Sequence, residues 1–143
     1  MSAQGAETRQ LGRWTLSRKL GEGAFANVFL AHSGSQRCVA KVIDTRRDGV
    51  REIAQKEVRL LAQLSHPNIV QLVDTQVTST RIVMYLELCS GGHLLGLVRS
   101  RGERALSEDQ VFRVFRSVVA PIAYMHGLNP PVAHRDLKLE NIL

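Results

Sequence analysis

The sequence closes on HRDLKLENIL, residues 134–143, a stretch that holds its densest group of reactive side chains. Asp136 offers a carboxylate that can accept a hydroxyl proton, and Lys138 offers a cation for a phosphoryl group in transfer. Asn141 adds an amide oxygen, which is a suitable ligand for a metal ion. The same residues on their own could form an ordinary polar loop, so their meaning depends on the residues upstream.

Length and composition indicate a folded protein of ordinary type. The 143 residues are 44% hydrophobic and 22% charged, which is typical of a globular domain. A chain of this size buries roughly 68–70% of the surface that its unfolded form exposes. The net charge is +6, but the Lys and Arg residues are scattered and no aromatic residues interleave with them. The pattern therefore favours solvated helix faces over a nucleic-acid interface.

Cysteine usage and hydropathy indicate the compartment. Cys38 and Cys89 lie far apart in apolar surroundings, which favours two buried thiols in a reducing compartment over a disulfide or metal framework. Residues 1–13 are polar and lack the apolar core of a signal peptide. No apolar run approaches the length of about 18 residues that a membrane span needs. We expect a cytoplasmic protein, with the nucleus as the alternative.

The first part of the chain reads mainly as β-structure. Apolar, β-branched segments separated by turn residues predict strands over residues 13–20, 27–32, 37–44, 69–77 and 81–88. One helix interrupts them, over residues 50–64. Its predicted apolar stripe consists of Ile53, Leu60, Leu61 and Leu64.

The second part reads as helical, with a short helix over residues 94–100 and then a longer one. Ser107 and Gln110 predict a capping box at its start, and Gly127 predicts its end. Pro121 predicts a kink or a locally rearranged turn inside it. Its predicted apolar stripe consists of Val111, Val114, Phe115, Val118, Ile122 and Met125. The fold class is therefore α+β, with a β-rich first part.

Glycines mark one of the turns, in GEGAFA, residues 21–26. Glycines at this spacing allow the backbone to turn tightly and to approach a phosphate closely. A dinucleotide-binding fold would need a helix directly after them, whereas two β-like runs follow here. A hairpin that clamps a nucleotide and a plain β-turn both remain open.

Two opposite charges stand where apolar side chains are expected. Lys41 is the only charged residue in CVAKVI, residues 38–43, and Glu57 shares the predicted apolar face of the helix. A buried charge is costly unless it is paired, so each residue would account for the burial of the other. The alternative is that both long side chains reach separately to water.

Taken in order, the glycine hairpin, Lys41, Glu57 and HRDLKLEN resemble the eukaryotic protein kinase family. The resemblance runs from about Trp14 to the last residue, and HRDLKLEN is its most specific part. Lys138, two positions after the Asp, is similar to the serine/threonine-specific branch. The resemblance implies a protein-kinase-like fold, with a β-rich small lobe that contains one main helix and the first helices of an incomplete α-helical large lobe. It also implies ATP and Mg²⁺ as cofactors.

The resemblance assigns expected roles to individual residues. The glycine backbone would cover the ATP phosphates, the Lys41–Glu57 pair would hold the α- and β-phosphates, and Leu86 would guard the back of the adenine pocket. The full expected ATP site is Leu20, Gly21, Glu22, Gly23, Val28, Val39, Lys41, Leu86, Glu87 and Cys89. The expected catalytic residues are Asp136, Lys138, Lys41 and Glu57, with Asn141 as a magnesium ligand and His134 and Arg135 as structural residues.

Several positions depart from the family pattern. Val39 stands two residues before Lys41, where the family carries Ala, and Ala26 replaces the third glycine. His93 follows the paired glycines where the family often has an acid or Ser. HGLNPPVAHRD, residues 126–136, is similar to kinases associated with clathrin adaptors and with cyclin G.

The resemblance also divides the chain. We expect a polar tail over residues 1–13, a small lobe over 14–86, a hinge over 87–92 and the start of a large lobe over 93–143. The 143 residues contain no D-F-G motif, so we expect the sequence to stop inside the catalytic loop. Two functions remain open: the front part of a serine/threonine kinase that acts on a protein substrate, with a regulatory protein as a possible partner, or a catalytically dead module that binds nucleotide or protein.

Overall fold

A computed structural model describes residues 8–102 and 104–143 of the chain. These residues form two compact units. The first comprises the described residues up to Gln63 together with Val70–Leu88, and the second comprises Leu64–Ile69 and Cys89–Leu143. The division after Leu88 falls within residues 87–92, the segment expected as a hinge. Residues 1–7 of the expected polar tail lie outside the described residues.

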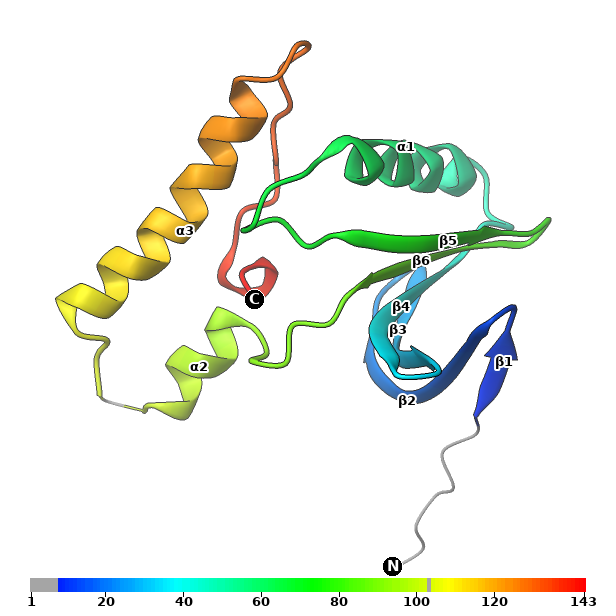
Figure 1. Cartoon of the computed structure of the whole chain (residues 1–143), viewed down its shortest axis with the longest axis horizontal. Helices are drawn as coiled ribbons and strands as arrows, with labels where there is room; N and C mark the ends of the chain where they lie inside the picture. Colours follow the sequence, from blue (N-terminus) through cyan, green and yellow to red (C-terminus); the bar gives the residue numbers. More distant parts are fainter. Residues whose placement is uncertain (1–7, 103) are drawn as a thin grey trace, which may run out of the picture. The chain divides into compact units, whose positions relative to one another are not determined.

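The first unit is built on an antiparallel sheet that curls on itself (Figure 1). Its strand order is β1-β2-β3-β4-β6-β5, and each neighbouring pair is antiparallel. The helix α1 runs along the part of the sheet formed by β5 and β6. The bounds are β1 Arg9–Leu11, β2 Trp14–Glu22, β3 Ala26–Ser33, β4 Gln36–Asp44, α1 Val50–Gln63, β5 Leu72–Val77 and β6 Arg81–Glu87. The predicted α+β class and its β-rich first part are therefore confirmed.

The two faces of the sheet carry separate apolar clusters, because successive side chains of a strand point to opposite faces. The cluster within the curl contains Trp14, Leu16, Ala31, Cys38, Ala40, Val83 and Tyr85. The cluster under α1 contains Ile43, Ala54, Ile82 and Met84. Burial raises the pKa of the Cys38 thiol to about 11, so this cysteine behaves as a small apolar residue.

The apolar stripe predicted for α1 was partly wrong. The helix itself forms almost as expected, but the side chain of Ile53 is 68% exposed and Leu60 is also exposed. The residues that pack toward the sheet are Val50, Ala54, Val58 and Leu61. The face with Ala54 fits the helical period as well as the predicted face with Ile53 does. The Ala54 face packs on the sheet because the small side chain of Ala54 permits a close approach to Ile82 and Met84.

The strand β1 lies inside the expected polar tail and was not predicted. It pairs with β2 through a tight turn in which Gly12 has a φ of +57°, a conformation that favours glycine. Its three residues, Arg9–Leu11, carry no alternating apolar pattern, so periodicity alone gives no strand signal. Pairing with β2 supplies its backbone with hydrogen-bond partners instead.

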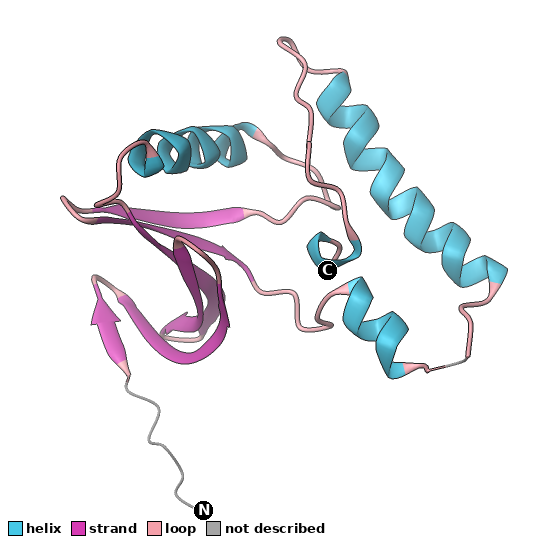
Figure 2. Ribbon diagram, turned by 180° about the vertical axis from the view of Figure 1, so that it is seen from behind, coloured by secondary structure: helices cyan, strands magenta, loops and turns pink. Residues whose placement is uncertain are grey.

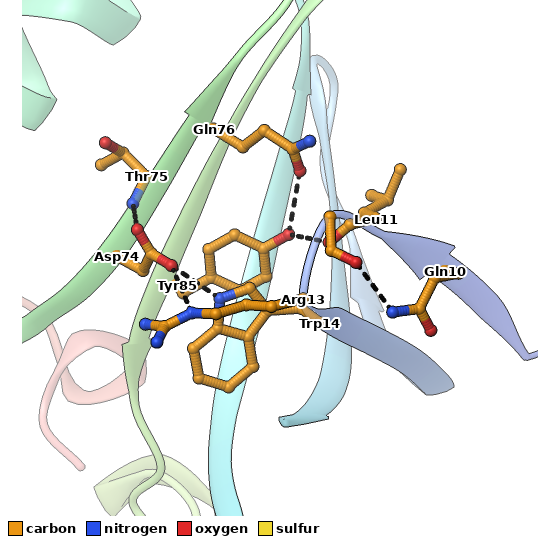
Figure 3. Close-up of polar contacts among 9 residues, drawn as sticks. Gln10, Leu11, Arg13, Trp14, Asp74, Thr75, Gln76 and Tyr85 are labelled. Carbon is orange, nitrogen blue, oxygen red and sulfur yellow. Dashed lines mark hydrogen bonds and ion pairs between the residues drawn. The ribbon is translucent and has the colours of Figure 1, made fainter. Parts of the chain in front are cut away.

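A polar network fastens this turn to β5 (Figure 3). The carboxylate of Asp74 accepts hydrogen bonds from Trp14 Nε1 at 2.8 Å and Arg13 Nε at 3.0 Å. The Trp14 ring stacks on Tyr85 with centroids 4.8 Å apart, and the Tyr85 hydroxyl donates to Gln76 Oε1. The buried indole N–H therefore has a charged acceptor, which is a strong arrangement.

We expect Asp74→Ala to destabilise the chain by about 1–3 kcal/mol, because it leaves the buried N–H of Trp14 without an acceptor. The bonds from Trp14, Thr75 and Arg13 lower the pKa of Asp74. Its stabilising effect is therefore present above the carboxyl pKa of the unfolded chain and is lost as the pH falls through the lower folded value. Urea unfolding at several pH values measures both effects.

The matched control for Asp74 is Arg13→Ala, which removes the more exposed donor to the same carboxylate. Exposed ion pairs contribute at most about 1 kcal/mol, so this variant should stay close to the wild type. Equal losses of unfolding free energy in the two variants would contradict the role of Asp74 as acceptor for Trp14. The same would follow if the stability of Asp74→Ala fell in acid as steeply as that of the wild type.

The second unit is helical, with α2 Leu94–Ser100, α3 Glu108–His126 and the one-turn η1 Leu139–Asn141 (Figure 2). The capping box predicted from Ser107 and Gln110 is present, and Gly127 caps the other end of α3. The helix continues through Pro121, which is buried. No helix within residues 8–102 and 104–143 is long and apolar enough to cross a membrane.

The predicted apolar stripe of α3 is only partly covered within its unit. Met125 is buried, but Val111 and Phe115 are 51% and 63% exposed, and Phe112 beside them is also exposed. The N-terminal half of α3 therefore presents large apolar side chains that the described residues do not cover. A surface of this kind favours association with other protein segments.

Candidate functional site

The glycine segment forms the turn of the β2–β3 hairpin. Gly23 N donates to Ala26 O at 2.7 Å, and Asp44 N donates to Phe25 O at 3.1 Å, which ties the hairpin tip to the end of β4. A strand follows the glycines, so the helix required by the dinucleotide-binding alternative is absent here. The glycines therefore lie in a β-hairpin, and their role as a clamp over a nucleotide stays a prediction.

Packing within the chain does not explain why Gly21 and Gly23 are glycines. A Cβ on Gly23 would meet Ala26 O at 3.5 Å, and a Cβ on Gly21 would meet Val28 Cβ at 4.0 Å, which are ordinary contacts. Neither residue has a positive φ. Their missing side chains leave bare backbone, which suits close approach by a molecule from outside.

The expected ion pair between β4 and α1 is present. Lys41 Nζ lies 2.6 Å from Glu57 Oε1, and the two side chains are 30% and 38% exposed. Lys41 points toward α1 because it alternates with Ala40, which faces the inside of the curl. The ammonium group is thus held by a carboxylate yet remains accessible to a further anion.

The sheet register places three of the expected adenine contacts on the same face as Lys41. Val28 is the cross-strand partner of Lys41, and Val39 is the partner of Leu86. Cross-strand partners point to the same side of a sheet, and Val39 lies two residues from Lys41. These side chains are half-buried, so together they form a partly open apolar surface beside the ion pair.

Of the remaining expected ATP-site residues, Leu20, Glu22 and Glu87 are exposed, and Cys89 is half-buried. Leu20 is 42% exposed, and Glu22 pairs with Lys19 at 2.6 Å. Glu87 N donates to Gln71 O, so this amide is already used within the first unit. Cys89 belongs to the second unit. Their contacts with nucleotide stay predictions.

The HRDLKLEN residues form a polar cluster in the second unit. Lys138 Nζ lies 3.0 Å from Asp136 Oδ2, and Asn141 Nδ2 donates to the same oxygen at 2.9 Å and to Asp136 O at 2.8 Å. Bonds from Lys138 and then Asn141 hold the pKa of Asp136 below its usual value. Asp136 is therefore a carboxylate at neutral pH, which suits a group that orients a hydroxyl.

The geometry of this loop also assigns roles to its first residues. His134 Nδ1 accepts from Asp136 N at 3.3 Å, and Arg135 has a φ of +62°, an unusual value for a residue with a side chain. Such conformations cluster at functional sites, where the surrounding structure maintains them. His134 therefore contacts the backbone of the loop, and the structural role expected for Arg135 stays a prediction.

Asn141 is a suitable single ligand for Mg²⁺. Its amide nitrogen makes both bonds to Asp136, which leaves the amide oxygen for a hard cation. The residues that the structure describes contain no group of three or more His, Cys, Asp and Glu side chains placed to hold a metal. Asn141 would thus supply one oxygen ligand to such an ion.

Two features of the site were not predicted. Asn141 positions Asp136, whereas the sequence suggested only a metal ligand. His93 caps α2, because its Nδ1 accepts from Gly96 N at 2.9 Å. A polar residue directly before a helical segment is the signal that could have identified this cap.

Comparison with known proteins agrees with this arrangement. The family model described as the protein kinase domain matches residues 14–143. The chain is 38% identical over 138 residues to CBL-interacting protein kinase 12 of Oryza sativa subsp. japonica, covering 93% of this chain and 25% of that protein. It is 34% identical over 128 residues to calcium-dependent protein kinase 5 of Plasmodium berghei (strain Anka), covering 87% and 22%. It is 32% identical over 139 residues to human serine/threonine-protein kinase H1, covering 96% and 32%. The chain thus spans a third or less of the length of these relatives.

Proposed function

The chain belongs to the protein kinase domain family, and from this premise we propose that it binds ATP and contributes to transfer of the γ-phosphoryl group to Ser or Thr of a protein substrate. The observation that carries the proposal is the Lys41–Glu57 ion pair, 2.6 Å long, beside Val28, Val39 and Leu86 on one face of the sheet. An accessible ammonium next to an apolar surface suits a ligand with a phosphate end and an aromatic end.

The first unit accounts for nucleotide binding. The bare hairpin backbone at Gly21 and Gly23 would lie over the phosphates, and Lys41, kept in place by Glu57, would bind their oxygens. The apolar side chains on the same face would contact the adenine ring. Mg²⁺, when bound, would neutralise phosphate charge, with the amide oxygen of Asn141 as one ligand.

The second unit accounts for the phosphoryl acceptor. The ionised carboxylate of Asp136 would orient a Ser or Thr hydroxyl and accept its proton. Lys138, already 3.0 Å from that carboxylate, would place positive charge next to the transferred group. The proposed specificity for Ser and Thr rests on Lys138 and on the similarity to serine/threonine-protein kinase H1.

A second candidate function is a module that binds nucleotide or protein without catalysis. The observation that favours it is that the Lys41–Glu57 pair and the half-buried Val28, Val39 and Leu86 all lie in the first unit, so that these residues could bind a nucleotide without the Asp136 loop. Under this alternative the 143-residue chain transfers no phosphoryl group above an Asp136→Ala control, although Lys41 still contributes to nucleotide binding.

Partners and compartment follow from the same proposal. A Ser/Thr-containing protein is the substrate, and a regulatory protein is a further partner, as the name of the CBL-interacting relative suggests for that protein. The cytoplasm is the proposed location, with the nucleus as an alternative.

The test of nucleotide binding is a titration with a fluorescent ATP analogue. We expect Lys41→Met to raise the dissociation constant by about ten-fold or more, since one charge-assisted hydrogen bond contributes about 1.5–3 kcal/mol. Glu57→Gln should have a smaller effect in the same direction, because it loosens Lys41 without removing it. The matched control is Lys56→Met, which removes an exposed lysine from α1, the helix that carries Glu57. Equal affinities for Lys41→Met and Lys56→Met would exclude the proposed phosphate contact.

A further inference from the structure

A separate cavity of about 760 Å³ opens at the tip of the β2–β3 hairpin. Its wall comprises Arg9 of β1, the hairpin tip, the end of β4, the loop after it and the start of β6. Asn27 and Val42 line it, and these cross-strand partners alternate with Val28 and Lys41 along their strands. The cavity therefore lies on the opposite face of the sheet from the Lys41–Glu57 pair.

Arginines dominate the charge of this cavity. Its wall contains Arg9, Arg46, Arg47 and Arg81, against the two acids Glu22 and Asp44. These arginines come from β1, the β4–α1 loop and β6, so the fold and not the local sequence gathers them. Clusters of arginine from separate segments are a common way to recognise phosphate groups.

Both acids are already matched by cations within the chain. The guanidinium group of Arg46 donates to the Asp44 carboxylate, and these bonds, with the charge of Arg81, lower the pKa of Asp44. Glu22 pairs with Lys19, which does not line the cavity. Within residues 8–102 and 104–143, neither Arg9, Arg47 nor Arg81 lies within 4.0 Å of a carboxylate oxygen. The wall therefore carries excess positive charge.

Other features of the wall suit a peptide. Arg47 lies over the Phe25 ring, 5.3 Å from its centroid, and Phe25 is 49% exposed, so an apolar side chain has a surface to contact. Asn27 Oδ1 is buried and accepts no hydrogen bond in the described part of the chain. A buried acceptor without a donor is unfavourable, and a peptide N–H group would satisfy it.

We propose that this cavity binds a peptide segment that carries a phosphorylated Ser or Thr. The phosphate oxygens accept hydrogen bonds from Arg47 and Arg81, with Arg9 adding charge at the edge. The peptide backbone donates to Asn27, and a neighbouring side chain packs on Phe25. A lipid headgroup is the less suitable ligand, because it offers no such pattern of N–H donors for the buried Asn27 oxygen.

A peptide in this cavity and a nucleotide beside Lys41 would contact the same hairpin from opposite faces of the sheet. The residues of the hairpin tip, Gly23 to Ala26, line the cavity, while Val28 belongs to the Lys41 face. Occupancy on one side would therefore restrict the conformation of the loop that covers the other. The proposal itself does not require the chain to be an active kinase.

The test is fluorescence anisotropy with a labelled short peptide that has phosphoserine at its centre and small uncharged residues around it. At an ionic strength of about 0.15 M, exposed long-range attraction is largely screened. We expect the unphosphorylated peptide to bind about ten-fold or more weakly, since a phosphate adds one to three charge-assisted bonds. The double variant Arg47→Gln with Arg81→Gln should lose this difference.

Two controls separate a built site from general charge. Arg59→Gln removes an exposed arginine of α1 that does not line the cavity and should leave peptide binding unchanged. Arg47→Lys keeps the charge but loses the planar fork, so it should bind more weakly than the wild type. Far-ultraviolet circular dichroism and thermal melting show whether each variant is folded.

Several outcomes would overturn the proposal. Equal binding of the two peptides would exclude phosphate recognition, and an equal loss in Arg59→Gln would reduce it to general charge attraction. Loss of peptide binding in Lys41→Met, with Arg47 and Arg81 intact, would place the phosphate at the nucleotide face instead. Tighter binding to phosphoinositide vesicles than to the peptide would assign the cavity to a lipid headgroup.

Discussion

Replacing Asp136 with Asn is expected to lower the rate of phosphoryl transfer by about 10²- to 10⁴-fold in an active kinase that contains this chain, the range typical for loss of a positioned base. Asn has nearly the same shape, so the loop bonds of Asn141 to the backbone of residue 136 can persist. The carboxylate that accepts the substrate proton is lost, whereas the ammonium of Lys41 is unchanged. Steady-state transfer from labelled ATP to a Ser-containing peptide measures the effect.

The control for Asp136→Asn is Glu140→Gln, which removes an exposed negative charge from the same loop. It should retain most of the activity, and nucleotide affinity should be unchanged in both variants. An Asp136→Asn protein with near-normal turnover would show that another group accepts the proton. A matching loss in Glu140→Gln would point to the net charge of the loop instead.

Replacing Trp14 with Ala is expected to destabilise the first unit by about 3–5 kcal/mol, as is typical for removal of a large aromatic side chain from a core. Trp14 is 1% exposed, stacks on Tyr85 and donates to Asp74. Its removal leaves a cavity within the curl of the sheet and takes a donor from the Asp74 carboxylate. Urea unfolding followed by circular dichroism measures the change in unfolding free energy. A loss of this size is a large fraction of the total stability of many domains.

The matched aromatic control for Trp14 is Phe25→Ala, since Phe25 is 49% exposed at the hairpin tip. Its removal should change the unfolding free energy by less than about 1 kcal/mol, because surface substitutions have small effects. Comparable losses for the two variants would mean that the Trp14 cluster does not form the core of the unit.

The sequence was sufficient for the strands and helices with strong periodicity and clear end signals. Residues 37–44 and 81–88 alternate or run apolar between turn residues, and β4 and β6 lie where they were predicted. Ser107 and Gln110 likewise predicted the start of α3. Local patterns gave no such signal for β1, whose pairing depends on β2 and on the Gly12 turn.

The parts of the candidate site that depend on local sequence could be predicted. The parts whose positions depend on tertiary packing could be predicted less well. Lys41 and Glu57 were recognised as misplaced charges, and the structure pairs them. The face of α1 was partly misjudged, because the helical period allows both the Ile53 face and the Ala54 face, and only the sheet distinguishes them. The arginine cavity could not be predicted, since β1, the β4–α1 loop and β6 meet there only in the folded chain.

The two backbone bonds at the hairpin tip affect the thermodynamics of ligand binding. The bonds from Gly23 N to Ala26 O and from Asp44 N to Phe25 O reduce the number of conformations that the loop can adopt. Fixing the backbone of a residue costs about 1–2 kcal/mol of conformational entropy. Part of this entropy is already lost when the chain folds and the two bonds form. A ligand that docks against this tip therefore binds with a smaller entropic penalty than it would on a loose glycine loop, and slow hydrogen exchange at the Asp44 amide in the free chain would be the signature of this preorganisation.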